Sequence, residues 1–218
     1  FWGLSYLLTN KKKKYFIVVI VACLFHTSAL MGFAIYFLYA YSQRKREYVK
    51  IANFRLDGSL APVKVFIYGA IVLLSLNVIA VLLRTFGLAK YAGYIQGNGS
   101  IYLMPSQIIL RLPIIILLII RWKRMMAEDE LTPFYGSMLV LDLLASQLIS
   151  INVYAFRIAS FFSEYNMLSY SALVYAGNRR YRTNRYVTLF YVLAYMAYYW
   201  VYYYAITGTH ATFPYLFA

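Results

Sequence analysis

Charged side chains are scarce in this chain, and acidic side chains are the scarcest. Only 13% of the 218 residues are charged, and Asp and Glu together number seven. Soluble domains carry about 25% charged residues on a background that is about 45–50% apolar, whereas 63% of this chain is hydrophobic. In water such a chain would expose a large apolar surface. The composition excludes an ordinary soluble domain and indicates an integral membrane protein.

Residues that bind metals or form disulfides are also rare. Cys23 is the only cysteine, and there are two histidines. One cysteine excludes an internal disulfide and any multi-cysteine metal site. The sequence has no phosphate-binding loop, no zinc-protease motif and no nucleophile elbow. The acidic run Glu128–Glu130 lies beside basic residues and is interpreted as a solvated charge patch. We therefore expect no metal and no cofactor.

The chain instead contains long apolar stretches, at least four of which reach the ~18 residues typical of a transmembrane helix. Residues 47–62 between them are mixed and predict a loop or a short interfacial helix. The predicted fold is all-α: a polytopic transmembrane bundle of about six to seven spans, forming one domain over residues 1–218. Because the chain begins with Phe1 rather than Met, we expect a fragment, the C-terminal part of a longer membrane protein. The expected spans are 15–41, 63–83, 105–120, 134 to about 154, 158 to about 176 and 186–206, with 1–8 as the end of another helix.

The basic residues fall in short clusters between the apolar stretches. A net charge of +14 would suit nucleic acid, but clusters beside spans instead set membrane orientation or contact anionic lipid, so no nucleic-acid partner is expected. The loops at 42–62, 121–132 and 177–185, with their flanks, hold thirteen Lys and Arg, against seven on the other side. The positive-inside rule then places the glycine- and tyrosine-rich loop 84–104 outside the cell. The run Lys11–Lys14 supplies four of the seven and contradicts this orientation.

Ionisable side chains within the expected spans indicate a structural or functional role, because inserting one charged side chain into the membrane costs at least ~2.5–3.5 kcal/mol. His26 lies about three turns into its span, either as a neutral imidazole hydrogen-bonded to a neighbouring helix or as a functional group. Arg84 lies where a span meets the outward loop, either snorkelling to the interface or binding a ligand. Arg111 lies inside a span.

Two further acidic positions allow alternative interpretations. Arg157 and Glu164 are seven residues apart and share one helix face. They form either an ion pair between spans or a site in which Arg157 presents its guanidinium to a phosphate, with Glu164 deeper in the same cavity. Asp142 begins a polar row with Ser146 and Ser150. It is a base, the counter-ion of an arginine, or a residue close to the cytoplasmic end, and the last interpretation is favoured.

Three segments carry a family resemblance. Residues 23–30, Cys-Leu-Phe-His-Thr-Ser-Ala-Leu, resemble the Phe-His-x-Ser-Ala-Leu segment of the EpsG family, Wzy-like membrane proteins of bacterial exopolysaccharide and capsule synthesis. Residues 157–162, Arg-Ile-Ala-Ser-Phe-Phe, are similar to that family's arginine followed by an aromatic pair, although Phe161 replaces the commoner tyrosine. Residues 212–215 resemble its Pro-Tyr ending. The order and spacing of these segments fit along nearly the whole chain.

The resemblance implies a polysaccharide polymerase in the bacterial cytoplasmic (inner) membrane. Its substrate would be an undecaprenyl-diphosphate-linked oligosaccharide, and its partners would be the lipid bilayer and other polysaccharide-synthesis membrane proteins. An acceptor hydroxyl would attack an anomeric carbon, and a lipid diphosphate would leave. Arg157 and Arg84 would stabilise the leaving group without a metal, and Glu164 or His26 would act as the base.

A large glycan also needs aromatic platforms in an outward cavity. Tyr91, Tyr94 and Tyr102 of the loop 84–104 are the predicted platforms. The alternative functions are a membrane acyltransferase that modifies the glycan, a transporter or flippase of the lipid-linked glycan, and a non-catalytic scaffold. Transporters often show inverted repeats, and no such symmetry is visible in this sequence.

Overall fold

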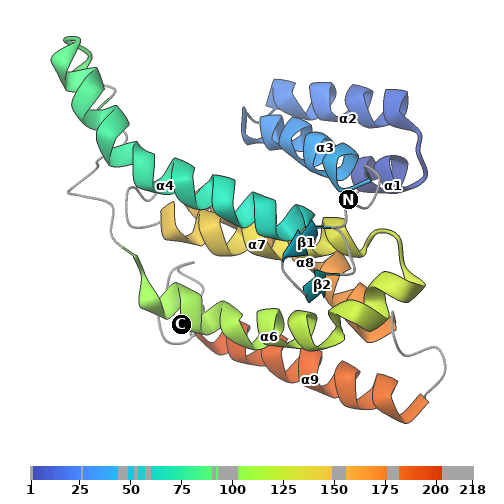
Figure 1. Ribbon diagram of the computed structural model, residues 1–218. Coiled ribbons are helices and arrows are strands. Elements are labelled where there is room, and N and C mark those ends of the chain that lie inside the picture. Colours follow the sequence, from blue (N-terminus) through green and yellow to red (C-terminus); the bar gives the residue numbers. More distant parts are fainter. Residues whose placement is uncertain are drawn as a thin grey trace, which may run out of the picture.

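Helices make up nearly all of the chain that the structure describes. The computed structural model describes residues 2–25, 27–43, 49–51, 54–56, 60–89, 92, 103–148, 156–175 and 182–202. In chain order the elements are α1 (Trp2–Leu8), α2 (Lys12–Phe25), the 3₁₀ helix η1 (Thr27–Leu30), α3 (Met31–Ser42), β1 (Val49–Ile51), β2 (Phe54–Leu56), α4 (Ala61–Thr85), α6 (Pro105–Glu128), α7 (Thr132–Gln147), α8 (Phe156–Tyr175) and α9 (Arg182–Trp200) (Figure 1).

Most of the predicted helices are confirmed. Helices α4, α6, α7, α8 and α9 coincide with the apolar stretches of the sequence, and α6 begins at Pro105 and continues through Pro113. Proline suits the first turn of a helix because its missing N–H needs no intrahelical partner there. By length and composition, α4 and α6 are the two helices of the described chain that could cross a membrane. The structure confirms a helical fold but not the predicted number of spans.

The prediction of one span over residues 15–41 is wrong. Helix α2 ends at Phe25, and after η1 the helix α3 runs back along α2 as the second arm of a hairpin (Figure 1). The Tyr15 hydroxyl donates a 2.6 Å hydrogen bond to the Gly32 carbonyl, and the rings of Phe16 and Tyr36 lie 4.6 Å apart. A Cβ at Gly32 would lie 2.8 Å from Val19 Cγ2, so the missing side chain allows this close approach.

The expectation of a loop or interfacial helix at residues 47–62 also needs correction. Strands β1 and β2 pair antiparallel, with Val49 opposite Leu56 and Ile51 opposite Phe54. In each strand a basic residue stands between two apolar ones, which is the period-2 pattern of a strand. The all-α prediction is confirmed, and this short hairpin is a local exception to it.

Helix α7 is the centre of the bundle. Thirteen of its sixteen residues are buried, and it packs against α3, α4, α6 and α8. Helix α4 follows α7 through the contact of Gly69 with Leu144 and then projects beyond the other helices (Figure 1). Most side chains of α4 are exposed, including Phe66, Leu74 and Phe86. Such an apolar surface suits contact with lipid rather than water.

The helices alternate in direction, so their ends gather at opposite poles of the bundle. The ring of Tyr39 near the end of α3 lies 5.6 Å from that of Phe134 at the start of α7. Close to these, Trp122 near the end of α6 and Pro62 at the start of α4 both lie against Gly136. Four chain segments that the loops separate therefore meet at one pole.

Helices α2, α8 and α9 extend this pole. The guanidinium carbon of Arg185, near the start of α9, lies 4.1 Å from the ring centroid of Tyr175 at the end of α8. The rings of Tyr15 and Tyr36 stack with centroids 6.3 Å apart, which brings the start of α2 beside the later half of α3. We call this pole, formed by the starts of α2, α4, α7 and α9 and the ends of α3, α6 and α8, the basic end.

Candidate functional site

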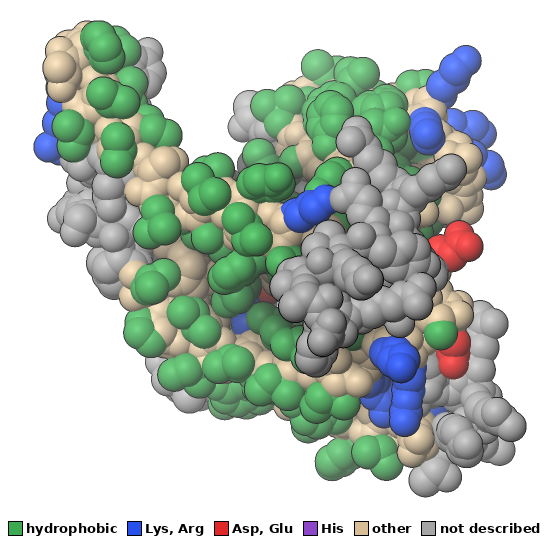
Figure 2. All heavy atoms as spheres, viewed as in Figure 1, with side chains coloured by type: hydrophobic (Ala, Val, Ile, Leu, Met, Phe, Trp, Pro, Cys, Tyr) green, Lys and Arg blue, Asp and Glu red, His purple; other side chains and the backbone are tan. Residues whose placement is uncertain are grey.

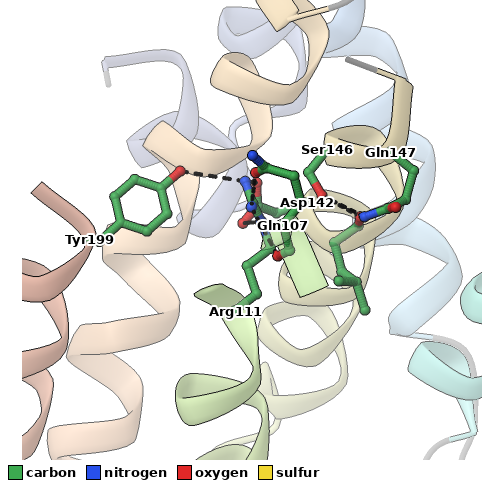
Figure 3. Close-up of polar contacts among 7 residues, drawn as sticks. Gln107, Arg111, Asp142, Ser146, Gln147 and Tyr199 are labelled. Atoms are coloured by element: carbon green, nitrogen blue, oxygen red, sulfur yellow. Dashed lines mark hydrogen bonds and ion pairs between the residues drawn. The ribbon is translucent and has the colours of Figure 1, made fainter. Parts of the chain in front are cut away.

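A buried ion pair joins α6 to α7 in the middle of the bundle. Arg111 Nε lies 2.8 Å from Asp142 Oδ2 and Arg111 Nη2 lies 3.1 Å from Asp142 Oδ1, which makes the contact bidentate (Figure 3). Both residues are only 2% exposed. Charges buried this deeply persist only when they are paired and hydrogen-bonded. The pair therefore fixes the register between two antiparallel helices.

The remaining donors of Arg111 are also engaged. Its Nη1 donates to the side-chain oxygen of Gln107 at 2.8 Å and to the Gln107 carbonyl at 3.3 Å. Its Nη2 donates to the Tyr199 hydroxyl at 3.4 Å, which ties α9 to the pair from the side opposite α7 (Figure 3). A guanidinium has five N–H groups, and these contacts account for all five. Arg111 therefore holds the helices together and has no donor left for a phosphate.

Helix α7 carries more polar side chains toward the pole opposite the basic end. Gln147 accepts a 2.8 Å hydrogen bond from the backbone N–H of Met104 just before α6, and its amide nitrogen donates to the Ser146 hydroxyl at 3.2 Å (Figure 3). Ser146 in turn donates to the Leu143 carbonyl at 2.6 Å. These contacts satisfy an N–H at the start of α6 that no helical carbonyl reaches.

Asn166 brings α8 to the same region. It is fully buried and lies beside the Asp142 carboxylate. Among the described residues, neither its amide nitrogen nor its amide oxygen has a hydrogen-bond partner. An unpaired buried amide costs about 1–3 kcal/mol. Asn166 is thus the polar side chain of this cluster that retains capacity for another group.

The hairpin tip lies against α8. Cα atoms of η1, which follows His26 directly, lie within 8 Å of Cα atoms of α8. Helix α8 is the helix that contains positions 157 and 164. Two segments that are more than a hundred residues apart in the sequence therefore meet within the bundle.

A comparison with known protein families assigns the chain to one of them. The sequence profile of the EpsG family matches residues 1–217. The chain belongs to the EpsG family. This family is one of polysaccharide-biosynthesis membrane proteins and is associated with polysaccharide polymerisation. No curated protein and no solved structure matches the chain.

The structure describes only some of the predicted site residues. His26, Tyr91, Tyr94 and Tyr102 lie outside the described residues. Arg157 and Glu164 lie within the helical backbone of α8, but their side chains are outside the described part. Their roles therefore stay predictions.

Arg84 is described, and it lies on the exposed last turn of α4, at the pole opposite the basic end. Among the described residues it has no ion-pair partner. Its position is compatible with both interpretations, an interfacial cation and a ligand for phosphate.

For Asp142 the structure decides between the three interpretations. It lies ten residues after the start of α7 and is the counter-ion of Arg111. The favoured interpretation, closeness to the cytoplasmic end, is therefore wrong. The pairing with Arg111 was missed, although a signal existed: the apolar stretch 105–120 contains one basic residue, and the stretch 134–154 contains one acidic residue.

A separate cavity of about 290 Å³ opens at the basic end. Glu128, Asp129, Tyr135, Ser171 and Tyr175 are among the residues that line it. Asp129 already accepts a 2.8 Å hydrogen bond from the Leu131 N–H, as expected of a turn residue. Within the described ranges, no three His, Cys, Asp or Glu side chains come together in a way that could hold a metal.

Proposed function

We propose that this EpsG-family chain is a polysaccharide polymerase that joins undecaprenyl-diphosphate-linked repeat units. In this proposal it is a multi-pass protein of the bacterial inner membrane, with about six to seven helical segments in the bilayer. The reaction occurs at the pole opposite the basic end, which faces outward under the positive-inside rule. The observation that supports the proposal is the proximity of η1 to α8, because residues 27–30, which follow His26 in the sequence, lie beside the helix that contains positions 157 and 164.

The proposed reaction transfers a glycan from one lipid carrier to another. An acceptor hydroxyl attacks the anomeric carbon of the donor, and the bond from that carbon to the lipid diphosphate breaks. Arg157 and Arg84 stabilise the negative charge that develops on the departing diphosphate, so no metal is required. Glu164 or His26 takes the proton of the attacking hydroxyl.

The neighbouring parts of the chain have supporting roles in this proposal. Tyr91, Tyr94 and Tyr102 stack on sugar rings of the bound glycan. The Arg111–Asp142 pair contacts neither substrate and acts as a positioning element, because it holds α6, α7 and α9 around α8. Exposed apolar helices such as α4 leave room for the polyprenyl tail to approach from the lipid.

One assay tests this proposal against its rivals. Purified full-length protein is mixed with a lipid-linked repeat unit, without acyl donor and without ATP, and the products are separated on a gel. A ladder of longer glycans supports polymerisation. Products of unchanged chain length, together with acylation when an acyl donor is added or with movement across vesicle membranes, would replace the proposal by an acyltransferase or a flippase.

The same assay tests the arginine that the mechanism needs most. Arg157→Ala is expected to abolish the ladder while the amount of protein in the membrane stays normal. Arg124→Ala, which removes an exposed arginine at the basic end, is the matched control and should leave the ladder unchanged. Unchanged polymer length in Arg157→Ala would reject the role of Arg157.

A further inference from the structure

Helices α2 and α3 are too short to cross a membrane. Their 14 and 12 residues correspond to lengths of about 21 Å and about 18 Å, whereas the hydrocarbon core of a bilayer is about 30 Å thick. Both helices nevertheless expose large apolar side chains on their outer surface. Leu24 is 81% exposed, Phe25 is 85% exposed and Phe37 is 69% exposed.

The direction of the hairpin places its two open ends together. Because α3 returns along α2, the start of α2 and the end of α3 both belong to the basic end. The four lysines Lys11–Lys14 lie at the start of α2, are all exposed, and border an open hollow of about 450 Å³ with Asn10. In Figure 2 most of the basic and acidic side chains lie in the right half of the view, while the left half is mainly apolar, apart from a basic patch on the end of α4.

We propose that residues 12–42 form a re-entrant hairpin, which enters and leaves the bilayer from the cytoplasmic face, and that Lys11–Lys14 bind the anionic phospholipid headgroups of that leaflet. The hairpin's apolar outer surface faces the acyl chains, and its tip stops inside the membrane against α8. Re-entrant segments are tolerated in a membrane where they pack against protein, and η1 lies beside α8.

The hairpin also removes the contradiction in the charge count. With Lys11–Lys14 moved to the side of the loops at 42–62, 121–132 and 177–185, that side holds seventeen Lys and Arg, and the opposite side holds three. The positive-inside rule is then obeyed without exception among the clusters. Lysines near an anionic leaflet each strengthen membrane attachment, and four adjacent ones form a polybasic segment.

Cysteine accessibility tests the topology in the full-length protein. This proposal rests on the multi-pass arrangement proposed above, so the experiment needs reference positions for both sides. In a Cys23→Ser background, single cysteines are introduced as Lys11→Cys and Gln43→Cys at the hairpin ends, with Glu130→Cys and Phe86→Cys as references. All four positions are exposed. Each variant is treated with a membrane-impermeant maleimide in spheroplasts and in inverted vesicles.

The labelling pattern separates the two proposals. We expect Lys11→Cys and Gln43→Cys to label with Glu130→Cys in inverted vesicles, and Phe86→Cys to label in spheroplasts. Labelling of Lys11→Cys together with Phe86→Cys in spheroplasts would overturn the hairpin and leave the multi-pass arrangement intact. Labelling of Glu130→Cys and Phe86→Cys from the same side would overturn the multi-pass arrangement itself.

A lipid titration tests the binding of headgroups. Full-length protein in neutral detergent is titrated with phosphatidylglycerol, with phosphatidylcholine or with inorganic phosphate, and thermal unfolding is followed. Phosphatidylglycerol alone should stabilise the protein, and replacing Lys11–Lys14 by glutamine should weaken its apparent affinity by about fivefold for each lysine removed. Thr85→Gln, at an exposed neutral position of the opposite pole, is the control. Equal stabilisation of wild type and the quadruple variant, or stabilisation by inorganic phosphate alone, would overturn the assignment to lipid.

Discussion

Arg111 of α6 and Asp142 of α7 form a two-point contact, at 2.8 Å and 3.1 Å, in the interior of the bundle. The pair does not behave as an isolated salt bridge, because Gln107 and Tyr199 bind the remaining donors of the guanidinium. It connects the fully buried face of α7 to both α6 and α9. The contact therefore helps to determine how three helices are placed around α8.

Removing one partner of this pair is expected to be far worse than removing both. Arg111→Met leaves the buried carboxylate of Asp142 without a counter-ion, which costs about 3–5 kcal/mol of stability. The double variant Arg111→Met/Asp142→Leu replaces the pair by apolar side chains and should recover most of that loss. The measurements are the amount of protein in the membrane and the thermal unfolding temperature in detergent.

The double-mutant cycle also separates a positioning role from a catalytic one. If the pair only positions helices, the double variant should keep a ladder of glycans while Arg111→Met alone loses folded protein. A different result would point to catalysis. If the double variant is stable and normally expressed but makes no polymer, Arg111 or Asp142 takes part in the reaction. Strictly additive losses of stability would contradict the coupling that the distances imply.

The sequence was sufficient to locate most of the helices, but it did not determine which of them cross the membrane. Helix α6 could be placed from Pro105 and its apolar run, since these signals are local. The turn after Phe25 could not, because no proline or glycine marks it and its stability comes from contacts such as Tyr15 with Gly32. The same limit applies to Arg111 and Asp142, whose pairing is a contact 31 residues apart in sequence.

The close approach of α2 and α3 gives a second prediction. Gly32→Ala places a Cβ 2.8 Å from Val19 Cγ2, and such overpacking costs about 1–3 kcal/mol. Val19→Ala in the same chain removes the colliding methyl groups and should restore part of the stability. Thermal unfolding of the single and double variants measures both effects. A Gly32→Ala protein as stable as the wild type would show that the two helices are not in contact there.

The identity of the base is open to a direct comparison. Glu164→Gln and His26→Asn each remove one of the two proposed bases, and loss of a general base lowers turnover by about 10²–10⁴-fold. We expect one variant to show this loss in the rate of ladder formation while its amount in the membrane stays normal. Glu130→Gln at the basic end is the control for loss of an acidic side chain. Normal activity in both variants would remove the base from the proposed mechanism.

The last prediction concerns Asn166. Substituting this residue distinguishes an amide with a purely structural role from one that binds a ligand. Its amide lacks a hydrogen-bond partner among the described residues, so Asn166→Leu should raise stability by relieving part of the about 1–3 kcal/mol cost of an unpaired buried amide. Ser169→Ala one turn further along α8 is the control, since it removes a 3.2 Å hydrogen bond to the Tyr135 carbonyl and should lower stability. A more stable Asn166→Leu protein with unchanged polymer length makes the amide dispensable for the reaction. A more stable protein that has lost polymer would place Asn166 in contact with the substrate, and a less stable one would contradict the absence of a partner.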